Sequence, residues 1–203
     1  MTTHRASATP VGAIAIGCSA GGLAALHLIL PALPLDFPVP VVVVCHSPAG
    51  SDTLISEALR RGCLLPVVEA AERMEIASGR IHVAPPDYHL LIEPDGVFAL
   101  SADDKVNNAR PAIDPTFESA AETWGDALVA VLLSGANADG ARGMATVKAA
   151  GGFCLVQDPA TAEEPTMPEA AMALGAAHWV APPEALGGML VSLCPSRSRT
   201  PCP

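Results

Sequence analysis

The sequence has no apolar run of about 18 residues, which is the length that a membrane-spanning helix needs. No secretory leader is expected, because residues 1–7 contain a single basic residue and neither an apolar core nor a cleavage site. Charged residues make up only 16% of the 203 residues and apolar residues 50%, a composition that excludes disorder over most of the length. The sequence therefore predicts a folded, cytoplasmic protein without membrane insertion.

Basic residues and metal-binding motifs are scarce as well. Only 11 Lys and Arg residues stand against 21 Asp and Glu residues, which gives a formal net charge of −10. A phosphate backbone is bound by a basic face, so nucleic acid is not an expected partner. The six cysteines form no C-x-x-C pair, and the histidines form no H-x-x-x-H or H-E-x-x-H motif. We therefore expect reduced, mostly buried thiols and no metal ion.

The order of the apolar runs predicts the fold class. Short β-branched runs alternate with longer helical stretches, which is typical of βαβ units in an α/β protein. We expect a doubly wound, mainly parallel sheet with helices on both faces, formed by one domain over residues 11–193. A short extension at residues 1–10 precedes this domain. The tail at residues 195–203 is rich in serine, proline and arginine and is expected to be disordered.

Residues 80–100 interrupt this alternation with short apolar stretches separated by turn residues. The stretches are 80–84, 88–93 and 97–100. Their spacing predicts an antiparallel hairpin excursion. The polar residues 101–110 predict a loop. Asp114 and Pro115 then predict the start of a helix, with the aspartate as its N-cap and the proline at the first helical position.

A turn of small residues at 17–22 follows the first expected strand. Its first five residues fit G-x-S-x-G, the strand-to-helix elbow that presents a serine, here Ser19, at the edge of a sheet. The N–H groups at the start of the next helix are candidates to bind an oxyanion. The other interpretation is that Ser19 is only the N-cap of that helix. A dinucleotide loop fits less well, because the spacing is not G-x-G-x-x-G, and no cofactor is expected.

A serine nucleophile needs a base and a carboxylate that orients the base. His46 ends the second expected strand, and a parallel sheet with sequential strands adjacent places it beside Ser19. Asp139 follows a later strand and lies on the same edge. The alternatives are a loop histidine that caps a turn and an aspartate that caps a helix beginning at Gly140. Because all three residues follow strands, Ser19, His46 and Asp139 together predict a catalytic triad.

The chain order Ser, His, Asp differs from the Ser, Asp or Glu, His order of ordinary α/β-hydrolases. The segments around these residues also resemble a known family. They are IGCSAGG (16–22), CHSPAG (45–50), IHVAP (81–85), RPAID (110–114), LSGANADG (133–140), QD (157–158) and MP (167–168). In this order and at this spacing, they resemble the catalytic domain of the chemotaxis protein-glutamate methylesterases (CheB-like). The resemblance extends over about residues 11–193.

The resemblance implies hydrolysis of glutamyl methyl esters, and deamidation of glutamines, on the cytoplasmic helices of chemoreceptors or similar signalling proteins. The family's serine, histidine and aspartate fall on Ser19, His46 and Asp139. His46 then takes the proton of Ser19, methanol leaves, and water hydrolyses the acyl-enzyme. Backbone N–H groups near Ala20 and Gly21, and near Ala136, are the candidates for the oxyanion hole and the pocket around it.

The chain departs from the family pattern at Ser47 and Ala136, where family members commonly carry methionine. Both positions adjoin the site, so we expect a different pocket wall. The resemblance includes no receiver domain of the kind that usually precedes the catalytic domain, and we expect none in this chain, since about ten residues precede the first expected strand. A separate regulatory protein is then the expected source of control. The competing hypothesis is a non-catalytic regulatory or protein-binding module that keeps the methylesterase fold.

Overall fold

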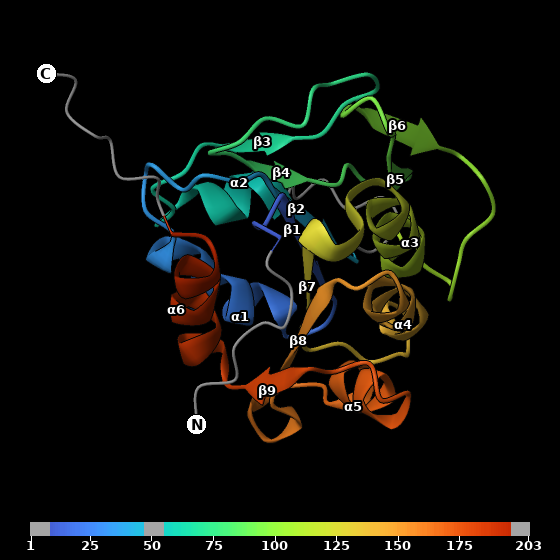
Figure 1. Ribbon diagram of the computed structural model, residues 1–203. Helices are drawn as coiled ribbons and strands as arrows, with labels where there is room; N and C mark the ends of the chain where they lie inside the picture. The colour runs from blue at the N-terminus through green and yellow to red at the C-terminus, as the bar shows by residue number, and fades with distance from the viewer. Residues whose placement is uncertain (1–8, 47–54, 196–203) are drawn as a thin grey trace, which may run out of the picture.

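The computed structural model describes residues 9–46 and 55–195. Its centre is a seven-stranded sheet in the order β3-β4-β2-β1-β7-β8-β9, and all neighbouring strands in it are parallel (Figure 1). Strands β5 and β6 form a separate antiparallel hairpin. The strands are β1 (Ala13–Cys18), β2 (Val41–Cys45), β3 (Val67–Glu69), β4 (Ile81–Val83), β5 (His89–Ile92), β6 (Phe98–Ser101), β7 (Leu128–Leu132), β8 (Phe153–Gln157) and β9 (Trp179–Ala181).

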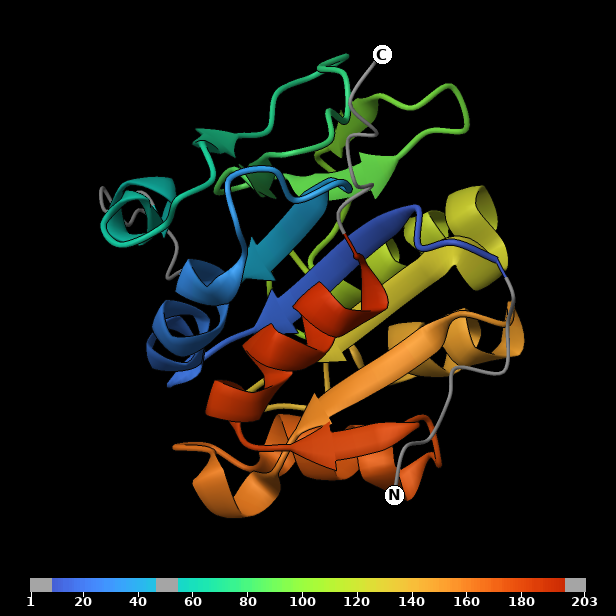
Figure 2. The same cartoon turned by 60° about the vertical axis from the view of Figure 1, so that its left-hand side comes forward.

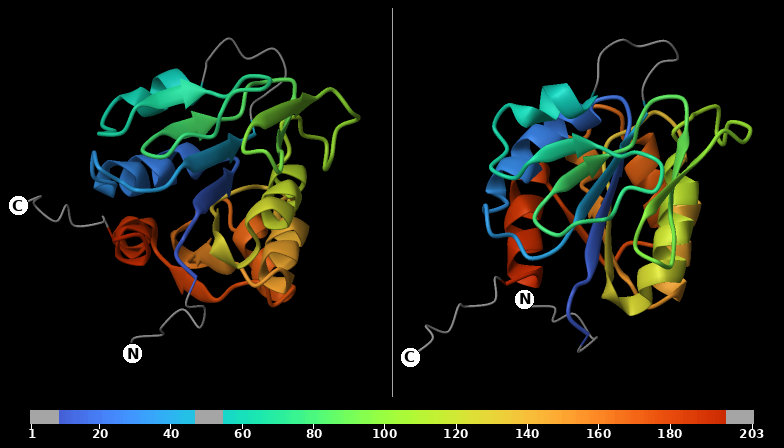
Figure 3. Two further views of the ribbon diagram at one scale, coloured as in Figure 1. Left: turned by 45° about the horizontal axis from the view of Figure 1, so that its top comes forward. Right: turned by 90° about the horizontal axis from the view of Figure 1, so that it is seen from above.

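Helices cover both faces of the sheet, which lies between them when the molecule is seen from above (Figure 3). Helices α1, α2 and α6 pack on one face, and α3, α4 and α5 pack on the other together with the hairpin. The helices are α1 (Gly22–Ile29), α2 (Ile55–Arg60), α3 (Ile113–Trp124), α4 (Ala141–Ala149), α5 (Thr166–Ala173) and α6 (Pro183–Leu193). Short 3-10 turns at η1 (Leu30–Ala32), η2 (Gly125–Ala127) and η3 (Pro159–Thr161) complete the connections.

Strand β2 illustrates why the sequence folds in this way. It consists of four valines and a cysteine, and all five residues are buried. Val41 and Val43 belong to the core under α1 and α6, whereas Val42 and Val44 belong to the core under α3 and α4. A strand that is covered on both faces needs apolar residues at every position. The predicted doubly wound α/β fold is therefore confirmed.

Residues 80–84 were predicted as part of the antiparallel excursion, and this prediction is wrong. Strand β4 lies in the main sheet, where it pairs in parallel with β2 and β3, and all three of its residues are buried. The N–H of Ala84 still donates to the oxygen of Val43, at 2.9 Å, so the prolines that follow mark the exit from the sheet rather than a tight reversal. The hairpin consists of β5 and β6 alone.

The start of α3 also differs from the prediction. The helix begins at Ile113 with Ala112 as its N-cap, so Asp114 lies inside the first turn. Oδ1 of Asp114 accepts a hydrogen bond from the N–H of Gly143 in α4, at 2.8 Å. Pro115 is tolerated in the first turn because an N–H there has no partner within the helix. The free N–H groups of α3 are instead bound by a carboxylate from another segment, as described below.

The extension at 1–10 and the tail at 195–203 lie mostly outside the described residues, as does Ser47. Over residues 9–46 and 55–195, no helix combines the length and the apolar character that crossing a membrane requires. The sequence predicts mostly buried thiols. Within the described ranges, Cys18, Cys45, Cys154 and Cys194 are buried, and Cys63 is partly exposed.

Candidate active site

The order of the strands places the loops after β1, β2 and β7 next to one another. β1 lies between β2 and β7, and the registers pair Cys18 with Cys45 and Gly17 with Leu132. Parallel strands end on the same edge of a sheet, and the arrowheads in Figure 2 point to that common edge. Ser19 directly follows β1 and His46 directly follows β2. Asp139 lies in the loop between β7 and α4, so all three predicted residues reach this edge.

Glycines make the elbow around Ser19 sterically feasible. A Cβ at Gly17 would lie 2.4 Å from Cγ2 of Ile113, so the first residue of α3 packs directly on β1 at this point. Gly21 has a φ of +74°, in the left-handed region that side chains other than glycine rarely adopt, and it caps α1. The N–H of Ser19 donates to the oxygen of Ser134 after β7, at 2.9 Å. The turn is therefore fixed by both α3 and the neighbouring strand end.

His46 and Asp139 form a hydrogen-bonded ion pair. Nε2 of His46 lies 2.7 Å from Oδ2 of Asp139, with the two side chains 10% and 0% exposed. The hydrogen bonds to Asp139 lower its pKa and so favour the ionised carboxylate, which can only accept, so Nε2 is the ring nitrogen that carries the proton and donates it. Nδ1 is then the nitrogen that is left to act as a base. The N–H of His46 donates to the oxygen of Cys18, at 3.1 Å, which holds the histidine beside the elbow.

Asp139 binds the free N–H groups at the start of α3 and not those of α4. Its carboxylate accepts hydrogen bonds from the N–H of Ile113 at 2.6 Å and of Asp114 at 3.2 Å. Helix α4 begins at Ala141 with Gly140 as its N-cap, and no side chain caps it. The alternative interpretation of Asp139 as a cap for the helix after Gly140 is therefore wrong. A helix N-terminus favours negative charge, so α3 contributes to keeping Asp139 ionised.

Asn107 is the fourth donor to this carboxylate. Its Nδ2 lies 3.0 Å from Oδ1 of Asp139 and 3.4 Å from Oδ2 of Asp114. Burial alone would raise the pKa of Asp139, but the hydrogen bonds from His46, Ile113 and Asn107 outweigh it and hold the pKa below its usual value. The carboxylate is therefore ionised at neutral pH, as a group that orients and stabilises a protonated histidine must be.

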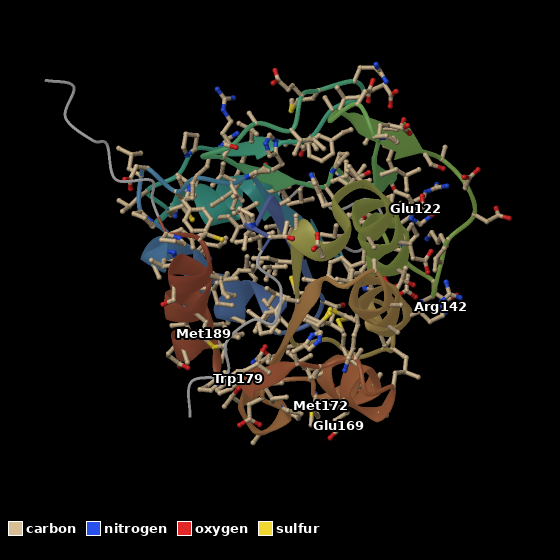
Figure 4. All side chains as sticks on the ribbon, viewed as in Figure 1. Glu122, Arg142, Glu169, Met172, Trp179 and Met189 are labelled. Atoms are coloured by element: carbon tan, nitrogen blue, oxygen red, sulfur yellow. The ribbon has the colours of Figure 1, made fainter. Side chains whose placement is uncertain are left out.

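Asp114 shows the opposite behaviour, although it is also buried. Burial raises its pKa above the ordinary value, and the hydrogen bond from Gly143 offsets this only in part. Nε of Arg142 lies 3.6 Å from Oδ2 of Asp114, while Nη2 of the same side chain binds Glu118 at 3.3 Å. Arg142 is mostly exposed on the outer side of α4 (Figure 4), so water weakens its effect on Asp114.

Buried polar contacts connect the loop after β7 to residues 157–167. The N–H of Ser134 donates to Oε1 of Gln157 at 2.9 Å, and Oγ of Ser134 donates to the oxygen of Ala20 at 2.8 Å. A Cβ at Gly135 would lie 2.4 Å from Cε of Met167 and 3.0 Å from Cβ of Ser19. Through these contacts, the segments that contain Gln157 and Met167 hold the loop after β7, and this loop in turn contacts the Ser19 turn.

A cavity of about 520 Å³ opens over Ser19 and His46. The described residues that line it are Ser19, Ala20, Leu23, Cys45, His46, Ile55, Asn107, Asn108, Ala109 and Asn137. One wall is apolar and the other carries three asparagines. Of the predicted pocket residues, Ala20 lines this cavity, whereas Gly21 and Ala136 lie outside its lining. Ser47 lies outside the described residues.

The asparagine wall is the part of the site that sequence reasoning missed. Asn107 and Asn108 come from the polar loop 101–110, and both have left-handed backbone conformations, with φ of 50° and 62°. Asparagine adopts this region more readily than most residues, so two adjacent asparagines were the available signal of a special turn. Nothing in the pattern, however, indicated that the turn would reach Asp139.

Ser19 and His46 face the same cavity without a direct hydrogen bond between their side chains. A gap of this kind is common in ligand-free active sites, where the catalytic contacts tighten on binding. Within the described ranges, the N–H groups of Ala20 and Ala136 donate to no other group, and Ala20 lines the cavity whereas Ala136 does not. The same ranges contain no group of three or more acidic, histidine or cysteine side chains arranged to hold a metal ion.

Fold and site together define an α/β domain with a histidine–aspartate pair beside a serine elbow. The CheB methylesterase family profile matches residues 14–190. A protein of Leptospira interrogans (strain Fiocruz L1-130) named "Putative protein-glutamate methylesterase/protein-glutamine glutaminase" is 45% identical over 181 residues, which cover 89% of this chain and 94% of that protein. A "Protein-glutamate methylesterase/protein-glutamine glutaminase" of Symbiobacterium thermophilum is 41% identical over 169 residues, 83% of this chain and 47% of the relative.

A solved structure agrees with these relatives. The crystal structure of the Thermotoga maritima CheB methylesterase catalytic domain superimposes with a TM-score of 0.87 and 36% identity. It covers 91% of this chain and 100% of its own. The chain belongs to the CheB methylesterase family.

Proposed function

We propose that this chain hydrolyses glutamyl methyl esters, and deamidates glutamines, through Ser19, His46 and Asp139 within a catalytic unit at residues 11–193. The observation that carries the proposal is the 2.7 Å hydrogen bond between His46 Nε2 and Asp139 Oδ2, at the wall of a cavity that also contains Ser19. Membership of the CheB methylesterase family supports the same reaction.

The His46–Asp139 hydrogen bond and the shared cavity support the following proposed mechanism. Nδ1 of His46 takes the hydroxyl proton of Ser19 as its oxygen attacks the ester carbonyl, and the N–H of Ala20, with that of Ala136, stabilises the oxyanion. Asp139 holds Nε2 and stabilises the imidazolium. His46 then gives the proton to the leaving methoxide oxygen, which departs as methanol, or to the amide nitrogen of a glutamine, which departs as ammonia. Water, deprotonated by His46, hydrolyses the acyl-enzyme to free glutamate and restores Ser19.

The substrate and setting follow from family membership. We propose a methylated chemoreceptor, or a similar signalling protein, as substrate, and the cytoplasm as the place of the reaction. The apolar wall at Leu23 and Ile55 suits the aliphatic stem and methyl group of the ester, and the asparagine wall suits the polar backbone of the substrate segment. A separate regulatory protein is the proposed source of control. Ser47 and Ala136 are the proposed points at which the pocket differs from that of relatives.

Labelling with a fluorophosphonate tests the role of Ser19 directly. We expect the reagent to modify Ser19 in the wild-type protein and to leave Ser19→Ala unlabelled. Ser19→Ala should also lower methanol release from a methylated receptor fragment by on the order of 10³-fold or more, as loss of a triad nucleophile does. Ser192→Ala on the remote helix α6 is the matched control and should behave as wild type. Wild-type turnover by Ser19→Ala would remove Ser19 as the nucleophile, whereas a wild-type protein with neither turnover nor a reactive Ser19 would favour a non-catalytic module instead.

A further inference from the structure

Two cysteines directly precede the proposed nucleophile and base in the sequence. Cys18 ends β1 and precedes Ser19, and Cys45 ends β2 and precedes His46. The two cysteines are register partners on neighbouring parallel strands (Figure 1). Both side chains belong to the core under α1 and α6, so they point to the same side of the sheet. This arrangement makes them a facing pair of thiols.

We propose that a hydroperoxide converts Cys18 and Cys45 into a reversible disulfide that displaces Ser19 relative to His46 and so switches off the site. The effect on activity rests on the proposed esterase function, whereas the formation of the bond does not.

The spacing of the strands permits this bond. Neighbouring strands lie about 4.7–4.9 Å apart, which falls within the Cα separation of about 4.4–6.8 Å seen in disulfides. The Cβ atoms of a disulfide must approach to about 3.5–4.5 Å, so closure draws the ends of β1 and β2 together by roughly 1 Å. A bond that forms under such strain is also more easily reduced, as a reversible switch requires.

The cavity decides which thiol reacts first. Cys45 lines the cavity beside Ser19 and His46 and is 6% exposed, so it is the thiol of the pair that a small hydroperoxide in the site approaches first. Cys18 is sealed off, because the Cβ position of Gly22 lies 2.4 Å from Cys18 Cβ and 2.8 Å from its Sγ. The electrostatics agree with this order. The Cys18 thiol lowers the pKa of Cys45 against the effect of burial, whereas its interaction with Cys45, and then burial, raise the pKa of Cys18.

The chemistry balances in two steps. The Cys45 thiolate attacks one peroxide oxygen, the O–O bond breaks, and Cys45 becomes a sulfenic acid while hydroxide leaves. The sulfur of Cys18 then attacks the Cys45 sulfur, the S–O bond breaks, and water leaves with the Cys18 proton. Two thiols and one hydrogen peroxide give one disulfide and two waters.

The consequence for the site follows from sequence adjacency. The oxygen of Cys18 accepts the N–H of His46 at 3.1 Å, so the spacing of the two strand ends sets the position of the base relative to the nucleophile. A misplacement of about 1 Å in an active site can lower the rate by on the order of 10²-fold. Cys154 lacks these features, because it lies in the opposite core, where burial raises its pKa to about 12.

Trypsin provides a direct measurement of the bond. The sequence has no lysine or arginine between residues 6 and 59, so the peptide 6–60 contains Cys18 and Cys45 as its only cysteines. After treatment with hydrogen peroxide and then alkylation under denaturing conditions, we expect this peptide to carry no alkyl label and to have lost two hydrogen atoms. The untreated protein should carry two labels on it. Cys63, in the next cysteine-containing peptide, should keep its label and so reports general over-oxidation.

Activity and labelling complete the test. Methanol release and fluorophosphonate labelling of Ser19 should both fall by on the order of 10²-fold after peroxide and return with dithiothreitol. Cys18→Ala and Cys45→Ala, each compared with its own untreated sample, should form no disulfide, and peroxide should cause no loss that dithiothreitol reverses. Cys63→Ser is the matched control and should keep the wild-type response.

The two proposals fail in different ways. A peptide 6–60 that keeps both labels after peroxide overturns the cysteine proposal, whatever the activity, and this needs no variant to fold. A disulfide that forms while Ser19 labelling stays unchanged also overturns it. A reduced protein whose Ser19 is never labelled overturns the proposed function instead, and the tryptic peptide still reports whether the bond forms.

Discussion

The turn at 17–22 and the loop at 101–112 contribute to the same site by different means. The turn presents Ser19 on a strand end, and its backbone is determined by glycines that admit α3 and the left-handed φ of Gly21. The loop contributes no residue to the proposed covalent chemistry, but its Asn107 and the start of α3 hold Asp139. One region positions the reacting atoms, and the other adjusts the charge that supports them.

Replacement of the Asp139 carboxylate, which the loop region holds, has the largest expected effect on activity. Asp139→Asn cannot accept from Nε2 of His46 and from α3 as an anion does, so His46 loses its tautomer and the stabilisation of its protonated form. We expect kcat to fall by on the order of 10³–10⁴-fold. Steady-state methanol release measures this. A loss of less than tenfold would contradict a triad and would leave Asp139 as a structural cap only.

The second largest effect is expected from a methyl group added at Gly17 in the turn. Gly17→Ala puts a Cβ where Ile113 already lies, 2.4 Å from its Cγ2, so β1 and α3 must separate. Overpacking of this kind lowers the free energy of unfolding by about 1–3 kcal/mol. Because the same contact aligns Ser19 with the helix that holds Asp139, we expect kcat to fall by on the order of 10²-fold.

Urea unfolding and turnover together check the Gly17 prediction. Gly188→Ala, at an exposed helical position with open space around the new methyl group, is its matched control and should lose neither stability nor activity. If Gly17→Ala loses stability but keeps its turnover, the elbow and α3 are not coupled.

Asn107→Ala tests the loop side with a smaller effect. The hydrogen bond from Asn107 favours the ionised carboxylate, so its loss raises the pKa of Asp139. Protonation of the base His46 also stops the reaction as the pH falls, so the shift is measured on the carboxylate itself. An NMR titration of the Asp139 carboxyl carbon should show protonation at higher pH in Asn107→Ala than in the wild type. We expect kcat at neutral pH to fall by about tenfold, in proportion to one charge-assisted hydrogen bond.

The adjacent Asn108 is the comparison for Asn107, since it lines the same cavity without a bond to Asp139. Asn108→Ala should leave the Asp139 titration in place. An unmoved Asp139 titration in Asn107→Ala would show that Asn107 acts only on the shape of the loop.

The second buried carboxylate has the smallest expected effect. The pKa of Asp114 is raised, so its ionised form carries a cost in the folded protein, and this cost appears as the pH rises above the unfolded pKa. Asp114→Asn removes the cost and keeps an acceptor for Gly143. The free energy of unfolding at neutral pH should rise by less than about 1 kcal/mol, with turnover within about threefold of wild type. Urea unfolding at neutral and at acidic pH measures this. The gain in the free energy of unfolding should disappear at acidic pH, where Asp114 is protonated in both the folded and the unfolded protein.

The sequence predicts the residues that carry the proposed reaction better than the contacts that support them. Ser19, His46 and Asp139 follow apolar strands, and strand ends are visible in a pattern of valines and leucines. The parallel pairing of β4 was hidden, because Pro85, Pro86 and Asp87 resemble a hairpin turn whether the chain reverses or leaves the sheet. The capping of α3 by Asp139 was hidden as well, because that contact joins residues 26 positions apart and depends on how α3 packs on Gly17.

The central position of β1 has a consequence for how the protein loses its structure. β1 is hydrogen-bonded on both edges and covered on both faces, whereas the loop at 101–110 is held by a few side chains, such as Arg110 to Ala102 O at 2.7 Å and His89 to Asp104 O at 3.0 Å. Local opening on warming therefore begins in the loop and reaches the nucleophile last. The protein should become inactive while its sheet is still intact, with the serine in place and its supporting charge released.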